Sequence, residues 1–465
     1  MSISLNSAAL LSGNGIDVNS LVSEVLAPQN GQLQIFSQQQ SALQTQAGLL
    51  NGINNDLSAL LNAVNALTDV LGPLTAQAVN SSQPSIVTGS AQTTATPGNH
   101  TVVVSTLATQ GTVYTQAVND ANASILAAGD TTADLKIQVG GASGEHDIQI
   151  AQGSNDTLTT LAQYINSQNW GVTATVLNDA SGARLAIFSQ NTGSAGAITV
   201  VNNTTNLTFN APVGGSNASF TVDGVPFEST TNTFTGAIPG VTLNLVAAIP
   251  DVPVQLAIGP DFNKATQAIN NFVAAYNKVI SDINQQFTVD PTTNSEGPLG
   301  GDNSLRLLQS SLLADATYAT SSSATPGNLS ALGITMNDDG TLSVNSAQLS
   351  SALSNDPSSV TSFFQNDNGT GFANNFAADL QNLTDPTLGL LNIDLSQNRQ
   401  QQTDLSNAIS DFQDRMSAMQ RQLSKEFSQV NALIEAFPFT LRAIDEALGI
   451  QPSGSSNTAP ASSTG

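Results

Sequence analysis

The sequence contains no cysteine, which excludes disulfide bonds, cysteine-ligated metal sites and thiol nucleophiles. Charged residues make up only 9% of the 465 residues, and 34 acidic residues against 10 Lys and Arg give a formal net charge of −24. Nucleic acids and anionic membrane surfaces both require a basic protein surface, so we predict neither partner. The scarcity of charge favours a surface that contacts other proteins, because charged groups are depleted at the centre of such contacts.

Histidine occurs only twice, and the acidic residues form no recognisable catalytic or metal-binding motif. His100 and His146 are far apart in the sequence and lack the spacing of zinc-binding helices. The pair Asp338 and Asp339 lies in Asn-Asp-Asp-Gly, a sequence more typical of a hairpin turn than of a paired-acid hydrolase. We therefore predict no enzyme activity, no catalytic residue, no metal site and no cofactor.

The chain also lacks a long apolar run and a basic segment ahead of its first apolar stretch. No run approaches the roughly 18 apolar residues that span a bilayer. The first residues, MSISLNSAALLSGNGIDV, do not resemble a secretory signal. On these grounds alone the chain is expected to be soluble and intracellular, while export by a dedicated machinery that reads another signal stays open.

Near the N-terminus, apolar residues recur at steps of three and four, which is the spacing of a coiled-coil seam. A short helix is expected over 18–26 with Asp17 as its N-cap, and the residues 28–31 are expected to separate it from the main helix. Gly72 and Pro73 predict the end of that main helix. The seam positions are Phe36, Gln40, Leu43, Ala47, Leu50, Asn54, Leu57, Leu61, Val64, Thr68 and Leu71, with Ile53, Leu60 and Leu67 beside them.

The C-terminal part repeats this spacing. Its seam positions are Leu405, Ile409, Phe412, Met416, Met419, Leu423, Phe427, Val430, Ile434, Phe437, Leu441, Ile444 and Leu448. Pro438 is expected to kink or end the helix, and 451–465 to be disordered. The two stripes can pair within one molecule, leave apolar surface for neighbouring molecules, or do both. The polar seam positions Gln40, Asn54 and Thr68 would weaken the pairing and set its register.

The middle of the chain is dominated by strand patterns separated by Gly, Asn and Thr clusters. Strands are predicted over 99–107, 134–139, 146–150, 171–177, 184–189, 197–201, 219–222, 241–245 and 252–258. One helix is expected inside this block at 157–167, and helices return from Asp261, with shorter ones at 305–313 and 360–364.

We therefore predict a multidomain α+β fold in which both chain ends form a helical leg and two β-rich heads are inserted. The predicted division is a flexible segment at 1–35, a leg domain at 36–75 and 262–450, one head at 76–112 and 210–261, a second head at 113–209 and a disordered tail at 451–465.

Several longer motifs resemble one known family. They are GIDVNSLVSEVL (15–26), TVVVSTLATQGTV (101–113), FTVDGVPFESTTNTFTGAIPGVTLNL (220–245), GPLGGDNSLRLLQSSL (297–312) and LSALGITMNDDGTLSVNSAQLSSAL (329–353). In this order they resemble the flagellar filament cap protein family, also called the flagellar hook-associated protein 2 family. Residues 135–200 resemble a β-rich insert that also occurs in flagellins and other hook-associated proteins.

The resemblance implies a structural protein at the distal tip of a bacterial flagellum. Family members are expected to form a ring-like homo-oligomer, here a pentamer, whose legs contact flagellin or the hook-filament junction proteins. The heads would form a plate beneath which exported flagellin folds and joins the filament. A flagellar export chaperone is a further expected partner, and export would follow the flagellar type III route to the extracellular tip without a cleaved signal peptide.

The residues expected to contact other subunits or the filament are the seam residues Phe36, Leu43, Leu50, Leu57, Leu61, Leu405, Ile409, Phe412, Met416, Met419, Leu423, Phe427, Val430 and Ile434. Two alternatives remain at this point. One is an extracellular adhesin that binds through its heads, and the other is a different flagellar component, either flagellin or a junction protein.

Overall fold

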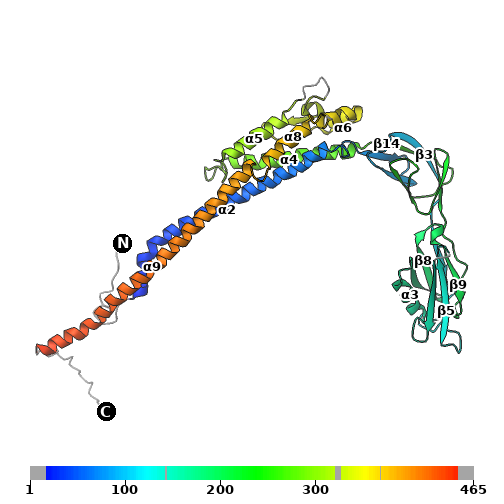
Figure 1. The fold of residues 1–465 in the computed structure, drawn as a ribbon, viewed down its shortest axis with the longest axis horizontal. Helices are drawn as coiled ribbons and strands as arrows, with labels where there is room; N and C mark the ends of the chain where they lie inside the picture. The colour runs from blue at the N-terminus through cyan, green and yellow to red at the C-terminus, as the bar shows by residue number, and fades with distance from the viewer. Residues whose placement is uncertain (1–16, 142–143, 320–325, 367, 449–465) are drawn as a thin grey trace, which may run out of the picture.

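A long helical leg carries two β-rich heads at one end of the molecule (Figure 1). The computed structural model describes residues 17–141, 144–319, 326–366 and 368–448. The leg contains both chain ends, and the heads are formed by the middle of the sequence, so the predicted α+β class and the arrangement of helical ends around a β-rich middle are confirmed. Among the described residues, no helix combines the length and the apolar character that crossing a bilayer requires.

The first described helix, α2 (Val18–Thr68), is longer than predicted. It begins at Asp17, whose Oδ1 accepts hydrogen bonds from the backbone N–H groups of Asn19 and Ser20, each at 3.1 Å. The predicted break at 28–31 is wrong, because the helix continues through Pro28 and the leg thus includes residues from Val18 onward. Packing explains this, since Val22 and Leu26 ahead of the proline are only 3% and 8% exposed, and buried contacts outweigh local helix propensity.

The last helix, α9 (Leu390–Ala447), is also longer than its seam pattern indicated. It begins ahead of Leu405 and passes through Pro438, so of the two outcomes predicted for Pro438, a kink or an end of the helix, the end does not occur. The residues that follow this proline include good helix formers such as Leu, Arg, Glu and Ala, which favour continuation. The predicted disordered tail at 451–465 lies outside the described residues.

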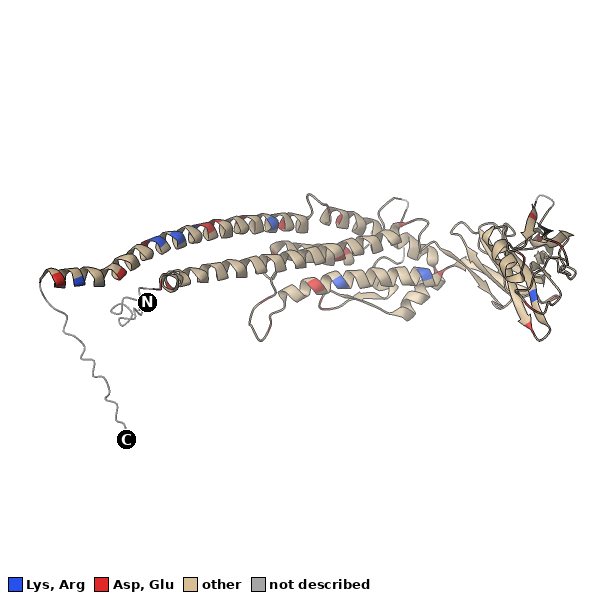
Figure 2. Ribbon diagram, turned by 90° about the horizontal axis from the view of Figure 1, so that it is seen from below, with Lys and Arg blue, Asp and Glu red and all other residues tan. Residues whose placement is uncertain are grey.

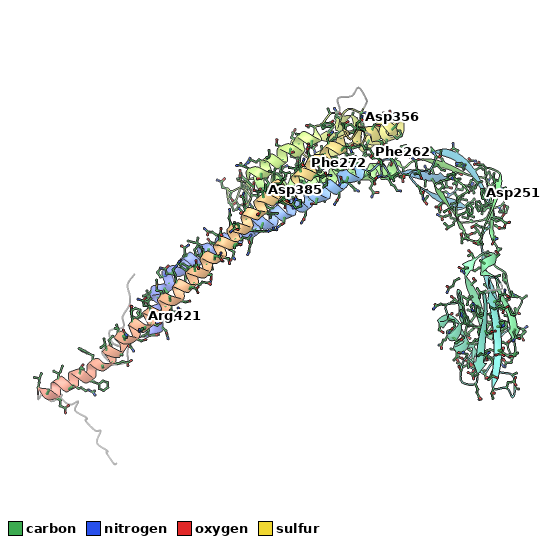
Figure 3. The ribbon with its side chains drawn as sticks, in the orientation of Figure 1. Asp251, Phe262, Phe272, Asp356, Asp385 and Arg421 are labelled. Atoms are coloured by element: carbon green, nitrogen blue, oxygen red, sulfur yellow. The ribbon has the colours of Figure 1, made fainter. Side chains whose placement is uncertain are left out.

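The core of the leg lies where α2 packs against α4 (Phe262–Phe287), α8 (Phe372–Leu383) and the first part of α9. Figure 3 places Phe272 in this thick part of the leg, where its ring meets those of Phe372 and Phe376 edge-on. The three-and-four spacing of apolar residues on α2 produces its buried face, which consists of Leu50, Ile53, Leu57, Leu60, Val64 and Leu67.

Shorter elements cover the rest of this core. They are α5 (Asn303–Ala316), α6 (Ser346–Asn355), α7 (Pro357–Phe364), the 3₁₀ turn η3 (Leu329–Leu332) and the hairpin of β15 (Ile334–Met336) with β16 (Leu342–Val344). The predicted turn at Asp338 and Asp339 is confirmed, because it joins the two hairpin strands. Gly340 closes that turn with a φ of +82°, a conformation that glycine adopts without strain.

The head next to the leg contains two antiparallel sheets around one apolar core. The larger sheet has the order β1-β14-β3-β10-β11, formed by Gln77–Ser81, Val254–Pro260, Gly98–Thr106, Ala218–Val222 and Val225–Ser229. The smaller sheet has the order β12-β13-β2, formed by Thr233–Thr235, Val241–Leu245 and Val87–Ala91. Four predicted strands fall on β3, β10, β13 and β14, whereas β1, β2, β11 and β12 were not predicted.

The distal head consists of two three-stranded antiparallel sheets and one helix. One sheet has the order β4-β8-β7, formed by Gln110–Tyr114, Gly182–Thr192 and Val172–Asp179, and the other has the order β6-β5-β9, formed by Glu145–Ala151, Thr132–Val139 and Ile198–Asn203. The predicted helix is confirmed as α3 (Leu158–Ser167), which starts with a reciprocal cap between Thr157 and Thr160. A short 3₁₀ turn, η2 (Ser194–Gly196), precedes β9.

The chain enters and leaves each head through two segments that lie next to each other. The chain enters the first head through β1 and leaves it through β14, and these strands pair side by side from Gln77 opposite Pro260. At the same place the N–H of Asp261 donates to the carbonyl of Ala76 at 2.8 Å. The distal head is attached in the same way, because the N–H of Thr109 donates to the carbonyl of Ser216 at 2.9 Å.

We predict that truncating a buried seam residue destabilises the leg strongly. Leu57 is fully buried among α2, α4 and α8, so Leu57→Ala should lower the free energy of unfolding by about 3 kcal/mol through lost contacts and a cavity. Urea-induced unfolding followed by circular dichroism measures this change. The matched control is Leu307→Ala on α5, where the side chain is 57% exposed and the expected change is within about 0.5 kcal/mol. Equal effects of the two substitutions would contradict the buried seam.

Candidate functional site

The candidate site is the seam between α2 and α9, which brings the two ends of the chain together. The two helices run antiparallel and lie side by side over most of α2 (Figure 1). Three cross-helix contacts set their register, namely Asn54 Nδ2 to Asn392 Oδ1 at 3.3 Å, Gln402 Nε2 to the carbonyl of Leu43 at 3.5 Å, and the rings of Phe36 and Phe412 with centroids 5.8 Å apart. Pairing of the two predicted stripes within one molecule is therefore what the structure contains.

The seam changes from core to surface along its length. Near the heads, Leu50 and Leu57 are buried because α4 and α8 cover α2, and Leu61 packs against the same core. Farther from the heads only α2 and α9 run together, and Figure 3 places Arg421 on this narrow part. The seam residues there are half-buried, and they are Phe36, Leu43, Leu405, Ile409, Phe412, Met416, Leu423, Phe427 and Ile434. Met419 and Val430 are exposed. The narrow part thus offers apolar surface that Leu50 and Leu57 do not.

The last part of α9 carries several exposed apolar residues. Figure 2 shows α9 continuing past the beginning of α2. Within the part of the chain that the structure describes, no other helix packs beside this extension (Figures 1 and 2). Its exposed large apolar residues are Leu433, Phe437, Phe439, Ile444 and Leu448, with Leu433 73% and Phe439 71% exposed. Exposed apolar residues gathered in one segment mark a candidate site of contact with another molecule.

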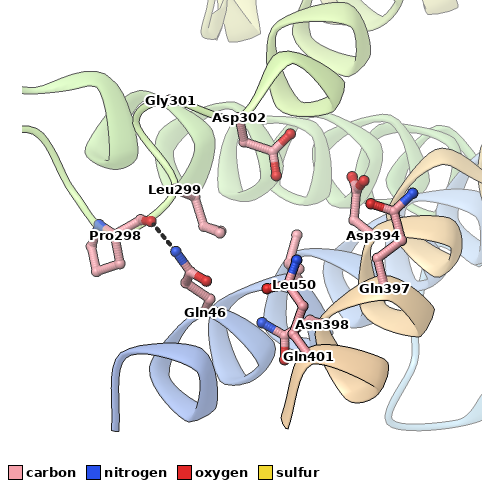
Figure 4. Close-up of a pocket in the computed structure, with 10 residues that line it drawn as sticks. All are labelled: Gln46, Leu50, Pro298, Leu299, Gly301, Asp302, Asp394, Gln397, Asn398 and Gln401. Atoms are coloured by element: carbon pink, nitrogen blue, oxygen red, sulfur yellow. Dashed lines mark hydrogen bonds between the residues drawn. The ribbon is translucent and has the colours of Figure 1, made fainter. Parts of the chain in front are cut away.

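Polar side chains interrupt the buried half of the seam. They surround a cavity of about 280 Å³ between α2, α9 and the loop before α5 (Figure 4). Gln46 Nε2 donates to the carbonyl of Pro298 at 3.0 Å, and the 6% exposed Asn398 accepts a hydrogen bond from Gln402 Nε2 at 2.6 Å. In Figure 4, Asp302 extends toward this space from the start of α5, and Asp394 extends toward it from α9.

Two buried oxygens of this polar stretch have no hydrogen-bond partner among the described residues. One is Oδ1 of Asn54 and the other is Oδ2 of Asp394. Burial raises the pKa of Asp394, and the negative charge of Asp302 adds to the increase, while a hydrogen bond with Ser304 opposes it. An unsatisfied buried oxygen costs free energy, so the α2–α9 pairing is weaker here than an all-apolar seam would be. This supports the predicted role of Asn54 as a weakening position.

The heads hold the two histidines in separate structural contacts. His100 Nδ1 lies 2.7 Å from Asp223 Oδ2 in the first head, where a hydrogen bond from the N–H of Thr101, followed by that from His100, lowers the pKa of Asp223. His146 stacks on Trp170 in the distal head, with ring centroids 4.5 Å apart. Among the described residues, no group of three or more His, Asp or Glu side chains is placed to hold a metal ion.

Comparison with known proteins identifies the family. The model "Flagellar hook-associated protein 2 N-terminus" matches residues 14–111, and "Flagellar hook-associated protein 2 C-terminus" matches residues 215–437. The chain belongs to the flagellar hook-associated protein 2 family. A third model, "Flagellin hook IN motif", matches residues 134–191 in the distal head. This range overlaps the residues 135–200 that resemble a flagellin insert.

Relatives of nearly full length support this membership. The chain is 28% identical over 443 residues to a B-type flagellar hook-associated protein 2 of Pseudomonas aeruginosa, and the alignment covers 88% of this chain and 91% of that protein. It is 26% identical over 452 residues to the flagellar hook-associated protein 2 of Escherichia coli K12, covering 92% and 95%. The crystal structure of the D1-D2-D3 domains of the flagellar cap protein from Escherichia coli is similar in fold, with a TM-score of 0.56, 26% identity and coverage of 75% of this chain and 99% of that chain.

Sequence reasoning missed the first part of the α9 seam. The residues that face α2 there are Leu391, Leu395, Asn398 and Gln402, and they continue the alternating steps of four and three back from Leu405. The signal was present, but two of its four positions are polar. A search for apolar residues alone therefore ends at Leu405, although Asn398 is buried like its apolar neighbours.

We predict that Asn54→Leu stabilises the leg by about 1 kcal/mol, because it removes a buried oxygen that lacks a donor. The hydrogen bond that it gives up to Asn392 is long, at 3.3 Å. Urea-induced unfolding measures the change, and Asn62→Leu, on the exposed face of α2, is the matched control with little expected effect.

A tighter seam should also alter assembly if Asn54 sets partner number, so we expect Asn54→Leu to shift the oligomer distribution and reduce motility. Mass measurement in solution and swimming assays test this. A more stable variant with unchanged oligomer state and motility would show that Asn54 has no such role.

Proposed function

We infer that this chain is the capping protein of a bacterial flagellar filament, and we propose that it acts through contact surfaces rather than through chemistry. The observation that carries this conclusion is the leg, in which the two chain ends pair and α9 extends an exposed apolar segment away from the heads. The near-full-length similarity to hook-associated protein 2 relatives supports the capping role, and neither the adhesin nor another flagellar component is favoured over it.

The leg would connect the cap to the filament. Burying the apolar residues of the narrow seam and of the α9 extension against flagellin or the hook-filament junction proteins would supply the binding free energy, roughly 25 cal/mol for each Å² of apolar surface removed from water. Figure 2 shows charged residues of both signs along α9, so the contact would use the apolar stripe of this helix and leave its charged side chains at the rim.

Several copies would form the cap together. We propose a ring-like homo-oligomer, with five copies as the working number. In this ring, one face of each leg would contact a different face of the next leg. Contacts of this head-to-tail kind close into rings when the rotation between copies permits. The heads would then form a plate, and exported flagellin would fold beneath it before joining the filament.

The same exposed segment also suggests how the chain is handled before assembly. We propose export by the flagellar type III route to the filament tip, without a cleaved signal peptide. An export chaperone that covers the apolar end of α9 inside the cell would prevent premature association, because Leu433, Phe437 and Phe439 are exposed in the single chain.

A gene-deletion strain tests the capping role. We expect it to release flagellin monomers into the medium and to build no filament, whereas a plasmid copy of the wild-type chain restores both. Electron microscopy of the cells and immunoblotting of the medium provide the readouts. Full-length filaments in the deletion strain would refute the proposal.

The same strain tests the α9 extension. We expect the double variant Leu433→Ser, Phe437→Ser to fold normally, since both side chains are exposed, but to restore filaments poorly. Leu307→Ser, which alters an exposed leucine on α5, is the matched control and should restore filaments fully. Equal rescue by both variants would show that the extension does not carry the contact.

A further inference from the structure

Two carboxyl groups face each other between α5 and α8 at the surface of the thick part of the leg, where Asp315 is half-buried and Asp379 is exposed. Asp315 lies near the end of α5, and its side chain is within hydrogen-bonding reach of Asp379 on α8. Oδ2 of Asp315 is buried and has no hydrogen-bond partner among the described residues. Beneath the pair, α4 contributes Tyr276, whose ring is fully buried and whose hydroxyl donates to the carbonyl of Leu312 at 3.5 Å.

Within the described part of the chain, nothing cationic compensates this pair. No Lys, Arg or His forms an ion pair with Asp315 or Asp379. The titratable groups that interact with Asp315 are Asp379 from α8 and Tyr276 from α4. Two ionised carboxylates offer only acceptors to each other, so neither can satisfy the other. A single added proton converts one of them into a donor and removes one negative charge.

We propose that a proton shared between Asp315 and Asp379 acts as a latch that fastens α8 to α5, and that its loss on raising the pH loosens this face of the leg. This inference concerns the stability of the leg and does not depend on the capping role.

The electrostatic environment of Asp315 supports a latch that operates near neutral pH. Burial raises its pKa from 3.8 to about 7, and the neighbouring carboxyl of Asp379 adds to the increase. Because the folded chain holds this proton more tightly than the unfolded chain, the associated stability is fully present below pH 4 and is lost as the pH rises through about 7. Burial also raises the pKa of Tyr276, and the charge of Asp315 adds to the shift, so the phenol stays neutral across this range.

Thermal unfolding of the full chain between pH 5 and pH 9 tests the latch. For the wild type we expect the Tm to fall by about 4 °C or more between pH 6 and pH 8.5. Asp315→Asn keeps the shape and supplies a permanent amide donor, so its Tm should fall clearly less and should exceed the wild-type Tm at pH 8.5. Asp414→Asn, on the exposed face of α9, is the matched control and should retain the wild-type dependence. Asp56 and Asp394, whose pKa values burial also raises, are present in every variant.

A local readout separates the latch from general effects of pH. Hydrogen exchange measured by mass spectrometry, corrected for the intrinsic pH dependence, should show protection of the α8 peptide 372–383 decreasing from pH 6 to pH 8.5 in the wild type. Asp379→Asn tests the second carboxyl independently, should Asp315→Asn fail to fold, and should abolish that decrease. The proposal is overturned if either folded variant keeps the full wild-type pH dependence, or if protection of α8 is the same at both pH values.

Discussion

The pairing of α2 with α9 is the contact that joins the two helical regions from opposite ends of the chain. These helices come from opposite ends of the chain, and their antiparallel register is held by a few named contacts such as the edge-on rings of Phe36 and Phe412. Closer to the heads, the same helix α2 presents its apolar face to α4 and α8, so the core and the narrow part of the leg both depend on one stripe of α2.

The same seam has two different physical characters along its length. Close to the heads a third and a fourth helix cover it, and most of its apolar residues are buried. In the narrow part, two helices alone cannot enclose their own seam, so large residues such as Leu423 and Phe427 keep part of their surface in water. The seam is thus buried near the heads and exposed to new partners in the narrow part. The polar residues around Asn398 lie between these two parts.

Sequence periodicity predicted the leg well because both long helices bury a stripe, and a stripe leaves a three-and-four pattern. It failed at Pro28, and α9 likewise does not end at Pro438, because the cost of a local irregularity was smaller than the packing or helix propensity of the flanking residues. It also failed for edge strands such as β12, which has three residues and a weak alternation of burial. The facing carboxyls of Asp315 and Asp379 could not have been predicted, because only the three-dimensional packing of α5 on α8 brings them together.

The way the heads are attached has a consequence for how this architecture can vary. The chain enters and leaves the first head through two neighbouring strands, and it enters and leaves the distal head through a second close pair of segments around Thr109 and Ser216. The whole segment from Ala76 to Asp261 therefore begins and ends at adjacent positions on the leg, as a short loop would. Heads of different size, or an additional module within the distal one, can be accommodated at these junctions while every helix of the leg keeps its path.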